Sequence, residues 1–350
     1  MENKLFGLID KLELEHKLSL QEYELLLNGF SSEIMEYARG KAEKIRCSIY
    51  GKDVYIRGLI EISNICKNNC LYCGIRRDNK ACSRYRLSKE DILSCCAEGY
   101  SLGFRTFVLQ GGEDPFFTDE VLCEIINEIK SKYPECAITL SLGERSKESY
   151  KALYDAGADR YLLRHETADS EHYSKLHPKE LTLENRMECL KTLKKIGFHV
   201  GCGFMVGSPY QTNRELAKDL KFIEEFSPDM CGIGPFLTHK DTPFANMPSG
   251  SFEMTLFCLS LVRLIKPNLL LPSTTALGTI HPNGREMGIL AGANVVMPNL
   301  SPISVRKKYM LYDNKISTDE ESAQSKFKLE KRMESIGYKI VTHRGDPKNY

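Results

Sequence analysis

The sequence lacks several features that mark common classes of protein. Its 48 basic and 47 acidic residues leave a net charge of +1, which argues against a nucleic-acid binder or a polybasic membrane protein. Its longest largely apolar stretch, residues 254–262, is too short to span a bilayer. Charged side chains interrupt residues 1–20, so we expect no signal peptide. With 42% hydrophobic residues, we expect a folded protein of the cytoplasm rather than a disordered chain.

Cysteine is present but too dilute for a small disulfide scaffold, with 13 in 350 residues. Because the number is odd, the cysteines cannot all pair with one another. We therefore expect reduced thiols, most of them packed as small hydrophobic side chains. No cysteine follows Cys258.

Short β-branched apolar runs alternate with amphipathic helical patterns along the chain. This alternation predicts an α/β fold, a complete (β/α)8 TIM-type barrel. A doubly wound open sheet is the alternative, but it requires a glycine-rich phosphate-binding turn after the first strand, where this chain has cysteines. We expect a helical N-terminal extension over residues 1–52, the barrel over 53–300 and a C-terminal extension over 301–350 that closes it. The eight predicted strands are 53–63, 106–110, 137–141, 160–164, 199–206, 230–235, 269–275 and 294–298.

Helix-capping signals support the predicted helices between these strands. Ser88 with Asp91 and Thr212 with Glu215 are capping-box pairs, in which a hydroxyl and a carboxylate satisfy free backbone N–H groups. The apolar spacing over residues 183–196 is typical of a helix and stops at Gly197, a common left-handed terminator.

Three cysteines lie directly after the first predicted strand, at positions 66, 70 and 73. In a barrel this is a loop at the catalytic face, and three close thiolates can hold an iron–sulfur cluster. Three ligands leave one corner of a 4Fe–4S cluster open for chemistry. A structural zinc site with Cys82 as fourth ligand and a chance group of buried thiols are the alternatives.

Other polar residues gather at the predicted strand ends. Two glycines after the second strand could let backbone approach a ligand closely, or form a simple tight turn. Arg160, Arg164 and Glu166 could hold a carboxylate and a ribose, or form a surface ion pair. Hydroxyls at strand ends could face the barrel mouth or be satisfied in the core, and methionines on strands are common core fillers.

The CxxxCxxC spacing, with Tyr72 before the last cysteine, resembles the radical S-adenosylmethionine (SAM) superfamily. Beside it, residues 110–115 (QGGEDP) are similar to the superfamily's SAM-binding GGE motif. The chain further resembles one family, the FeFe-hydrogenase maturation proteins called HydE, over residues 53 to about 312. The matching stretches are 69–80 (NCLYCGIRRDNK), 108–115 (VLQGGEDP), 139–144 (TLSLGE), 156–168 (AGADRYLLRHETA), 232–245 (GIGPFLTHKDTPFA) and 293–299 (ANVVMPN).

The resemblance implies a role for each matching residue. Cys66, Cys70 and Cys73 would ligate a 4Fe–4S cluster. The residues around SAM would be Tyr72, Gln110, Gly111, Gly112, Glu113, Ser141, Glu166 and Arg186. The residues lining the substrate cavity would be Thr139, Arg160, Arg164, Met230, Thr274, Thr275, Met297, Tyr309 and Tyr312.

The resemblance also implies an activity and partners. The enzyme would cleave SAM reductively to a 5′-deoxyadenosyl radical and help build the diiron subcluster of FeFe-hydrogenase, acting on an iron-bound cysteine complex with carbon monoxide and cyanide. Its partners would be a tyrosine-cleaving maturase, a scaffold GTPase maturase, the hydrogenase, and reduced flavodoxin or ferredoxin, in an anaerobic cytoplasm. Some family members carry a second cluster on three cysteines after the barrel, but since no cysteine follows Cys258 we expect a single cluster.

Three rival functions stay open. A methylornithine synthase-like mutase would share the barrel and the cysteine loop. Biotin synthase is disfavoured because it requires a second iron–sulfur cluster in the barrel. An iron–sulfur electron-transfer or scaffold protein would have four cysteine ligands and no SAM site.

Overall fold

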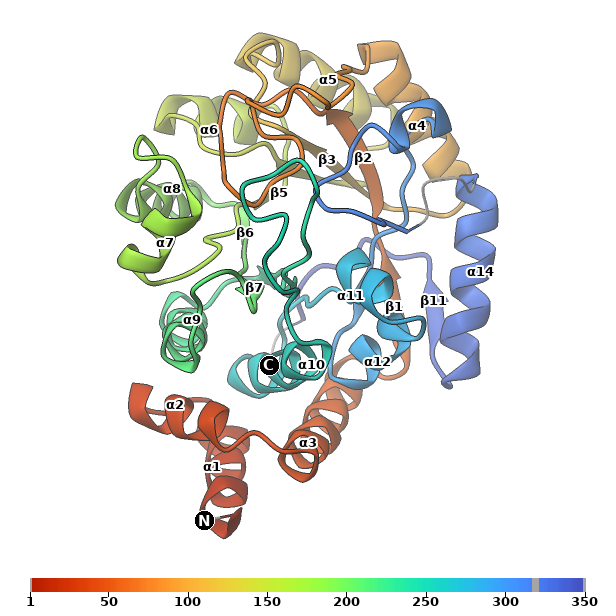
Figure 1. Cartoon of the computed structure of the whole chain (residues 1–350). Coiled ribbons are helices and arrows are strands. Elements are labelled where there is room, and N and C mark those ends of the chain that lie inside the picture. Colours follow the sequence, from red (N-terminus) through yellow and green to blue (C-terminus); the bar gives the residue numbers. More distant parts are fainter. Residues whose placement is uncertain (1, 317–320, 349–350) are drawn as a thin grey trace.

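The computed structural model describes residues 2–316 and 321–348, and a closed ring of parallel strands lies at its centre (Figure 1). Six strands pair in the order β2-β3-β4-β5-β6-β8. Parallel bridges from Met230 to Leu270 and from Pro272 to Val295 continue the ring. It closes where β10 pairs with β1, which runs on into β2. The predicted barrel is confirmed. Its strands are β1 Asp53–Ile56, β2 Gly58–Ser63, β3 Thr106–Gly111, β4 Ala137–Ser141, β5 Arg160–Leu162, β6 His199–Cys202, β7 Met205–Val206, β8 Met230–Cys231, β9 Gly234–Pro235 and β10 Val295–Val296.

The seventh strand is much shorter than predicted. Within residues 269–275 the structure contains bridges at Leu270 and Pro272 but no continuous ladder. Pro272 has no N–H to donate to a neighbouring strand, and the chain turns into a helix that begins at Thr275. Thr274 and Thr275 therefore stand at the start of a short helix rather than at the end of a strand.

Two other predicted strands are each split in two by glycine. β6 and β7 are separated by Gly203 with Phe204, and β8 and β9 by Gly232 with Ile233. A Cβ at Gly203 would come within 2.1 Å of the Gly232 carbonyl oxygen, so the two backbone segments approach more closely than any side chain would permit.

Helices surround the barrel, and the capping signals are confirmed. Ser88 and Thr212 both form capping boxes, and Gly197 terminates its helix in the left-handed conformation. The helices are α1 Glu2–Glu15, α2 Leu20–Asn28, α3 Ser32–Tyr50, α4 Lys89–Ser101, α5 Asp119–Lys132, α6 Lys147–Asp155, α7 Ser170–Leu176, α8 Leu183–Ile196, α9 Asn213–Phe226, α10 Phe252–Ile265, α11 Thr275–Ile280, α12 Gly284–Leu290, α13 Ile303–Arg306 and α14 Ser322–Ser335.

The N-terminal helices form an outer layer over one side of the barrel. α3 packs against α10, and α2 packs against α9, as Figure 1 shows at the red end of the chain. Because α10 lies between the barrel and α3, residues 255–265 of this helix are all buried. Burial on several sides explains the apolar sequence of α10. In the described part of the chain no helix is both long enough and apolar enough to cross a bilayer.

The C-terminal tail seals the end of the barrel opposite the catalytic loops. A strand that the sequence analysis missed, β11 Lys339–Val341, pairs in parallel with β1. The chain then passes under the barrel, where Thr106 donates a hydrogen bond to the Arg344 carbonyl at 2.8 Å. At three residues, β11 is too short to leave a clear periodic signal.

This tail corrects the prediction for Arg160. The Arg160 side chain is fully buried, but it points to the floor instead of lining the cavity: its Nη2 lies 2.6 Å from an Asp346 carboxylate oxygen. The same nitrogen donates to the Arg344 carbonyl at 2.9 Å. The residue stands at the first position of β5, and the first residues of parallel strands lie at the end away from the catalytic loops. Arg160 is thus a structural tie between barrel and tail.

We expect Asp346→Asn to lower the free energy of unfolding by about 1–2 kcal/mol, because it leaves a buried guanidinium unpaired at a partly exposed site. Burial raises the pKa of Asp346, but the hydrogen bond from Arg160 outweighs it and leaves the pKa lowered. The deficit should therefore shrink as the pH falls below about 4, where the wild-type carboxylate takes up a proton. Denaturant unfolding of the metal-free chain measures both effects.

The matched control is Asp155→Asn, whose ion pair with Lys151 is exposed, so its effect should stay below about 0.5 kcal/mol. Equal effects of the two substitutions would contradict a structural role for the Arg160–Asp346 pair.

Candidate functional site

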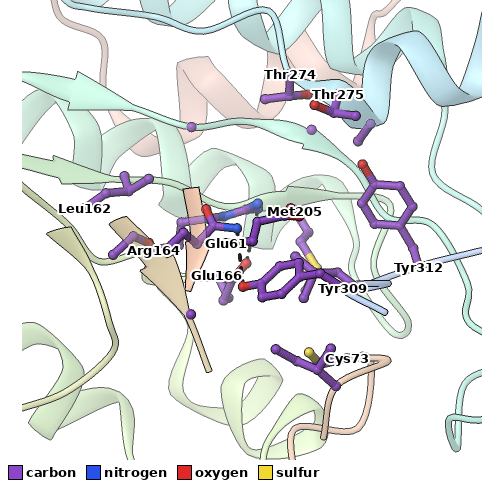
Figure 2. A pocket seen from close by; sticks show the side chains of 18 of the residues that line it. Glu61, Cys73, Leu162, Arg164, Glu166, Met205, Thr274, Thr275, Tyr309 and Tyr312 are labelled. Atoms are coloured by element: carbon purple, nitrogen blue, oxygen red, sulfur yellow. Dashed lines mark hydrogen bonds and ion pairs between the residues drawn. The ribbon is translucent and has the colours of Figure 1, made fainter. Parts of the chain in front are cut away.

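A cavity of about 350 Å³ occupies the barrel interior and opens at the catalytic end of the strands. Every residue assigned to the site from the sequence lines it except Arg160. In Figure 2, Cys73 lies on one side of the cavity, Thr274 and Thr275 lie on the opposite side, and Tyr309 lies between them. The barrel thus brings together residues from the whole length of the chain.

Backbone hydrogen bonds hold the cysteine loop in place. The Lys67 N–H donates to the Glu113 carbonyl at 3.0 Å, which ties the loop to the segment after β3. The Leu71 N–H donates to the Leu176 carbonyl and the Gly74 N–H to the Leu311 carbonyl, each at 2.9 Å. Three separate parts of the fold therefore fix the path of the loop.

The three thiols of this loop repel one another when they are ionised. Burial, together with the nearby Cys66, raises the pKa of Cys73 to about 12. The pKa of Cys70 is raised by burial and by both other thiols. A thiolate group of this kind requires a neighbouring positive charge, which iron ions supply on binding. The backbone N–H of Glu113, which points at the Cys66 sulfur from 3.4 Å, also favours the thiolate. The donor set fits an iron–sulfur cluster.

Cys82 stands apart from this group. It does not line the cavity, and its sulfur instead accepts a hydrogen bond from Asn64 at 3.5 Å. Among residues 2–316 and 321–348, no group of three His, Cys, Asp or Glu side chains is arranged to hold a single metal ion. The zinc alternative with Cys82 as a fourth ligand therefore gains no support.

The residues next to the loop form a narrow cleft. A Cβ at Gly112 would lie 2.2 Å from the Ile65 carbonyl oxygen and 2.8 Å from the Cys66 Cβ, so only glycine fits there.

Burial lowers the pKa of His177 to about 3, which keeps its ring neutral. Its Nδ1 donates to the Tyr173 carbonyl at 2.9 Å, so its Nε2 accepts the Tyr72 hydroxyl at 3.2 Å. Tyr72 is thereby held in one orientation beside the cysteines.

Arginine and glutamate side chains form one wall of the cavity. Arg186 donates to Glu144 at 2.6 Å and to the Arg164 carbonyl at 2.9 Å. Arg164 lies 3.2 Å from a carboxylate oxygen of Glu166, and Glu166 has a left-handed backbone with φ of 65°. The unusual backbone of Glu166 turns this carboxylate back toward the cavity (Figure 2).

Several polar atoms on the cavity wall have no hydrogen-bond partner in the described chain. They include the hydroxyls of Thr139 and Thr274. Buried polar groups in native proteins are nearly always satisfied. These atoms therefore mark positions where a bound molecule can complete the hydrogen bonding.

Arg57 is the main functional candidate that the sequence analysis missed. Its guanidinium lines the cavity near the floor, donates from Nη1 to the Met230 sulfur at 2.9 Å, and leaves Nε and Nη2 without a partner. Burial and the neighbouring Arg160 lower its pKa. A buried cation with free donors favours an anionic ligand. The signal was available, because Arg57 and Glu61 interrupt an otherwise apolar run of strand residues.

Glu61 and Lys315 also line the cavity and were also missed. They form a buried ion pair with each other, and Asn299 donates to the second Glu61 oxygen at 2.8 Å. No local sequence pattern indicates this pair, because its partners are separated by 254 positions.

Comparisons with known proteins agree with this geometry. Residues 60–223 match the radical SAM superfamily. The chain is 44% identical over 331 residues to the FeFe hydrogenase maturase subunit HydE of Thermotoga maritima, covering 95% of this chain and 93% of that protein. It is 28% identical to 3-methylornithine synthase of Methanosarcina acetivorans, covering 92% and 90% of the two chains.

The fold is also similar to a solved structure. The crystal structure of methylornithine synthase (PylB) superposes with a TM-score of 0.83 at 27% identity, covering 95% of this chain and 97% of that one. From the extent and identity of the match to the Thermotoga protein, the chain belongs to the HydE family of FeFe hydrogenase maturases, which are radical SAM enzymes.

Proposed function

We propose that this enzyme cleaves SAM at one 4Fe–4S cluster held by Cys66, Cys70 and Cys73 and acts on an iron-bound cysteine complex with carbon monoxide and cyanide. When bound, the cluster supplies the electron that converts SAM to methionine and a 5′-deoxyadenosyl radical. The observation that carries the proposal is a cavity, open at the catalytic end of the barrel, that is lined by all three thiols and has an unpaired buried cation near its floor.

The part of the cavity nearest the cysteine loop suits SAM. Its wall offers the backbone of Gly111 and Gly112, the Gln110 and Ser141 side chains and the Glu166 carboxylate, all at the carboxyl ends of strands or just beyond them. Glycine backbone can approach an amino-acid moiety closely, and a carboxylate can accept from ribose hydroxyls. The chain's residues would orient SAM and exclude water from it.

The part of the cavity farther from the cysteine loop suits an anionic substrate. Arg57 presents free donors there, and the Thr139 and Thr274 hydroxyls lack partners. The thioethers of Met230 and Met297 add polarizable, apolar wall. An iron complex with cyanide and carboxylate groups would satisfy the guanidinium, while its carbon monoxide ligands would contact the apolar wall.

The proposal extends to partners in hydrogenase maturation. The tyrosine-cleaving maturase would supply the iron complex, and the scaffold GTPase maturase and hydrogenase would receive the product. Reduced flavodoxin or ferredoxin would deliver the electron, and six basic residues against one acidic residue over positions 67–86 give the cluster loop a surface that suits an acidic donor.

Complementation tests the proposed function. In an anaerobic host that has lost its own maturase of this family, the wild-type chain should restore hydrogenase activity. The measurement is hydrogen evolution by the cell extract. Failure there, together with conversion of lysine to methylornithine by the purified enzyme, would contradict the proposal and favour the mutase.

Cys70→Ala should abolish both the cluster and SAM cleavage. Reconstituted wild-type chain should hold about four irons, one cluster's worth, and Cys70→Ala less than about one. Release of 5′-deoxyadenosine with dithionite and SAM should fall by at least about 100-fold, since only the cluster provides the electron. Cys82→Ala is the matched control and should keep both properties. About eight irons in the wild type would contradict the single cluster.

Arg57→Met should weaken substrate binding without affecting SAM cleavage. Loss of hydrogen bonds to a charged group, about 1.5–3 kcal/mol, corresponds to a rise of roughly 10- to 150-fold in the apparent substrate dissociation constant. Release of 5′-deoxyadenosine without substrate should stay within about twofold of wild type, because Arg57 lies at the far end of the cavity.

The thermal stability of the same variant distinguishes a binding role from a structural one. Since an unpaired buried charge is costly, Arg57→Met should unfold at the same temperature as wild type or higher. A less stable variant with unchanged substrate affinity would show that Arg57 is a structural residue.

A further inference from the structure

The segment over residues 302–316 covers the mouth of the cavity. The Leu311 carbonyl accepts the Gly74 N–H from the cysteine loop at 2.9 Å. On the other side, the Asp313 N–H donates to the Thr238 carbonyl, also at 2.9 Å, in the loop after β9. We call residues 302–316 the cover. It bridges two loops of the catalytic rim and contributes Tyr309 and Tyr312 to the cavity wall.

A buried ion pair joins the cover to the barrel wall. Lys315, on the cover, contacts a carboxylate oxygen of Glu61, on β2, and the two side chains are 8% and 1% exposed. Asn299 satisfies the other Glu61 oxygen. The lysine ammonium also donates to the Tyr309 carbonyl at 2.9 Å and lies 5.0 Å from the centre of the Tyr309 ring. The Lys315 ammonium therefore contacts both Glu61 on the barrel wall and Tyr309 on the cover.

The position of Tyr309 depends on this cation. The Tyr309 side chain is 2% exposed, and its hydroxyl accepts a hydrogen bond from the Gln110 amide at 3.4 Å. Gln110 stands at the catalytic end of β3, beside the glycines that follow it. A chain of contacts thus runs from Glu61 through Lys315 and Tyr309 to the SAM side of the cavity.

Stability alone does not account for an ion pair at this place. Two charges withdrawn from water recover little net energy, and an apolar pair would close the mouth as well. An ion pair that faces a cavity differs from an apolar contact in one respect: it is directional and holds one geometry of the cover. Its location on the cavity wall, rather than on the outer surface, connects that geometry to the reaction space.

We propose that Lys315 is a positioning residue, whose ion pair with Glu61 latches the cover over the cavity and holds Tyr309 against Gln110. This role rests on the proposed function, since a radical formed beneath the cover must be kept from other hydrogen-atom donors, such as solutes with C–H or S–H bonds, until it meets the substrate. Without the latch the cover opens more often, and SAM is consumed without conversion of substrate.

Lys315→Met tests the latch, because methionine keeps much of the length of lysine and removes its charge. Amide hydrogen exchange of Gly74 and Asp313 on the reconstituted enzyme reports opening of the cover directly. The Gly74 N–H donates to a carbonyl of the cover, and the Asp313 N–H belongs to the cover and donates to a rim loop. Exchange at both should become at least about tenfold faster. The ratio of 5′-deoxyadenosine released to substrate converted should rise by at least about threefold, because the radical then takes its hydrogen atom from solutes or side chains with weaker C–H or S–H bonds instead of reacting with substrate.

Two further variants separate a latch from simple destabilisation. Lys326→Met, which removes an ion pair with Glu330 on the outer helix α14, should leave both readings unchanged. The double variant Glu61→Gln/Lys315→Met removes the stranded carboxylate and should recover the thermal stability lost in Lys315→Met. Its fast exchange and its wasteful SAM cleavage should persist, because the latch is still absent.

The amide exchange rates and the ratio of 5′-deoxyadenosine to converted substrate also distinguish failure of the latch from failure of the proposed function. Wild-type exchange at Gly74 and Asp313 in Lys315→Met, or recovery of wild-type exchange in the double variant, would overturn the latch. Faster exchange in a protein that does not cleave SAM would leave the latch standing and overturn the proposed function instead.

Discussion

Desolvation of charge inside a closed barrel is the constraint on which this structure depends. Barrels of this type are usually filled by packed side chains, whereas this one keeps a cavity of about 350 Å³ lined by thiols, carboxylates and guanidinium groups. Each charge without a partner there carries a cost in folding energy. The unpaired atoms of Arg57, Thr139 and Thr274 are intelligible as a site that is completed by what binds in it.

The two ends of the barrel meet this constraint in different ways. At the floor, the C-terminal tail supplies Asp346 and backbone carbonyls that accept hydrogen bonds from the Arg160 Nη2. At the mouth, the cover supplies Lys315, which pairs with Glu61, and backbone hydrogen bonds also join the cover to the loops that contain Gly74 and Thr238. The floor contacts therefore close one end of the barrel, and the cover lies at the end where the cavity opens. One C-terminal extension provides both closures.

Local signals in the sequence were sufficient for most of the fold and for locating the cysteine loop on the cavity wall. The capping boxes at Ser88 and Thr212 act within one helical turn, and the cysteine loop spans eight residues, so both can be recognised from neighbouring positions. Arg160 and Arg164 show the limit of this approach. Arg160 begins the short strand β5 and Arg164 follows its other end, so one joins the floor and the other faces the cavity. The tail that pairs with Arg160 lies more than 180 positions away, and no local pattern indicates that contact.

The cysteines show how the same physical effect has two outcomes. Burial raises the pKa of Cys96, Cys202 and Cys258 in the barrel wall and helices, so these thiols stay protonated and pack as small hydrophobic groups. Burial raises the pKa of Cys70 and Cys73 in the same direction. The difference lies in the backbone, since contacts from Glu113, Leu176 and Leu311 fix the loop. The fold thus fixes the loop that carries these three thiols, and a bound iron–sulfur cluster would supply the positive charge that offsets repulsion among three thiolates.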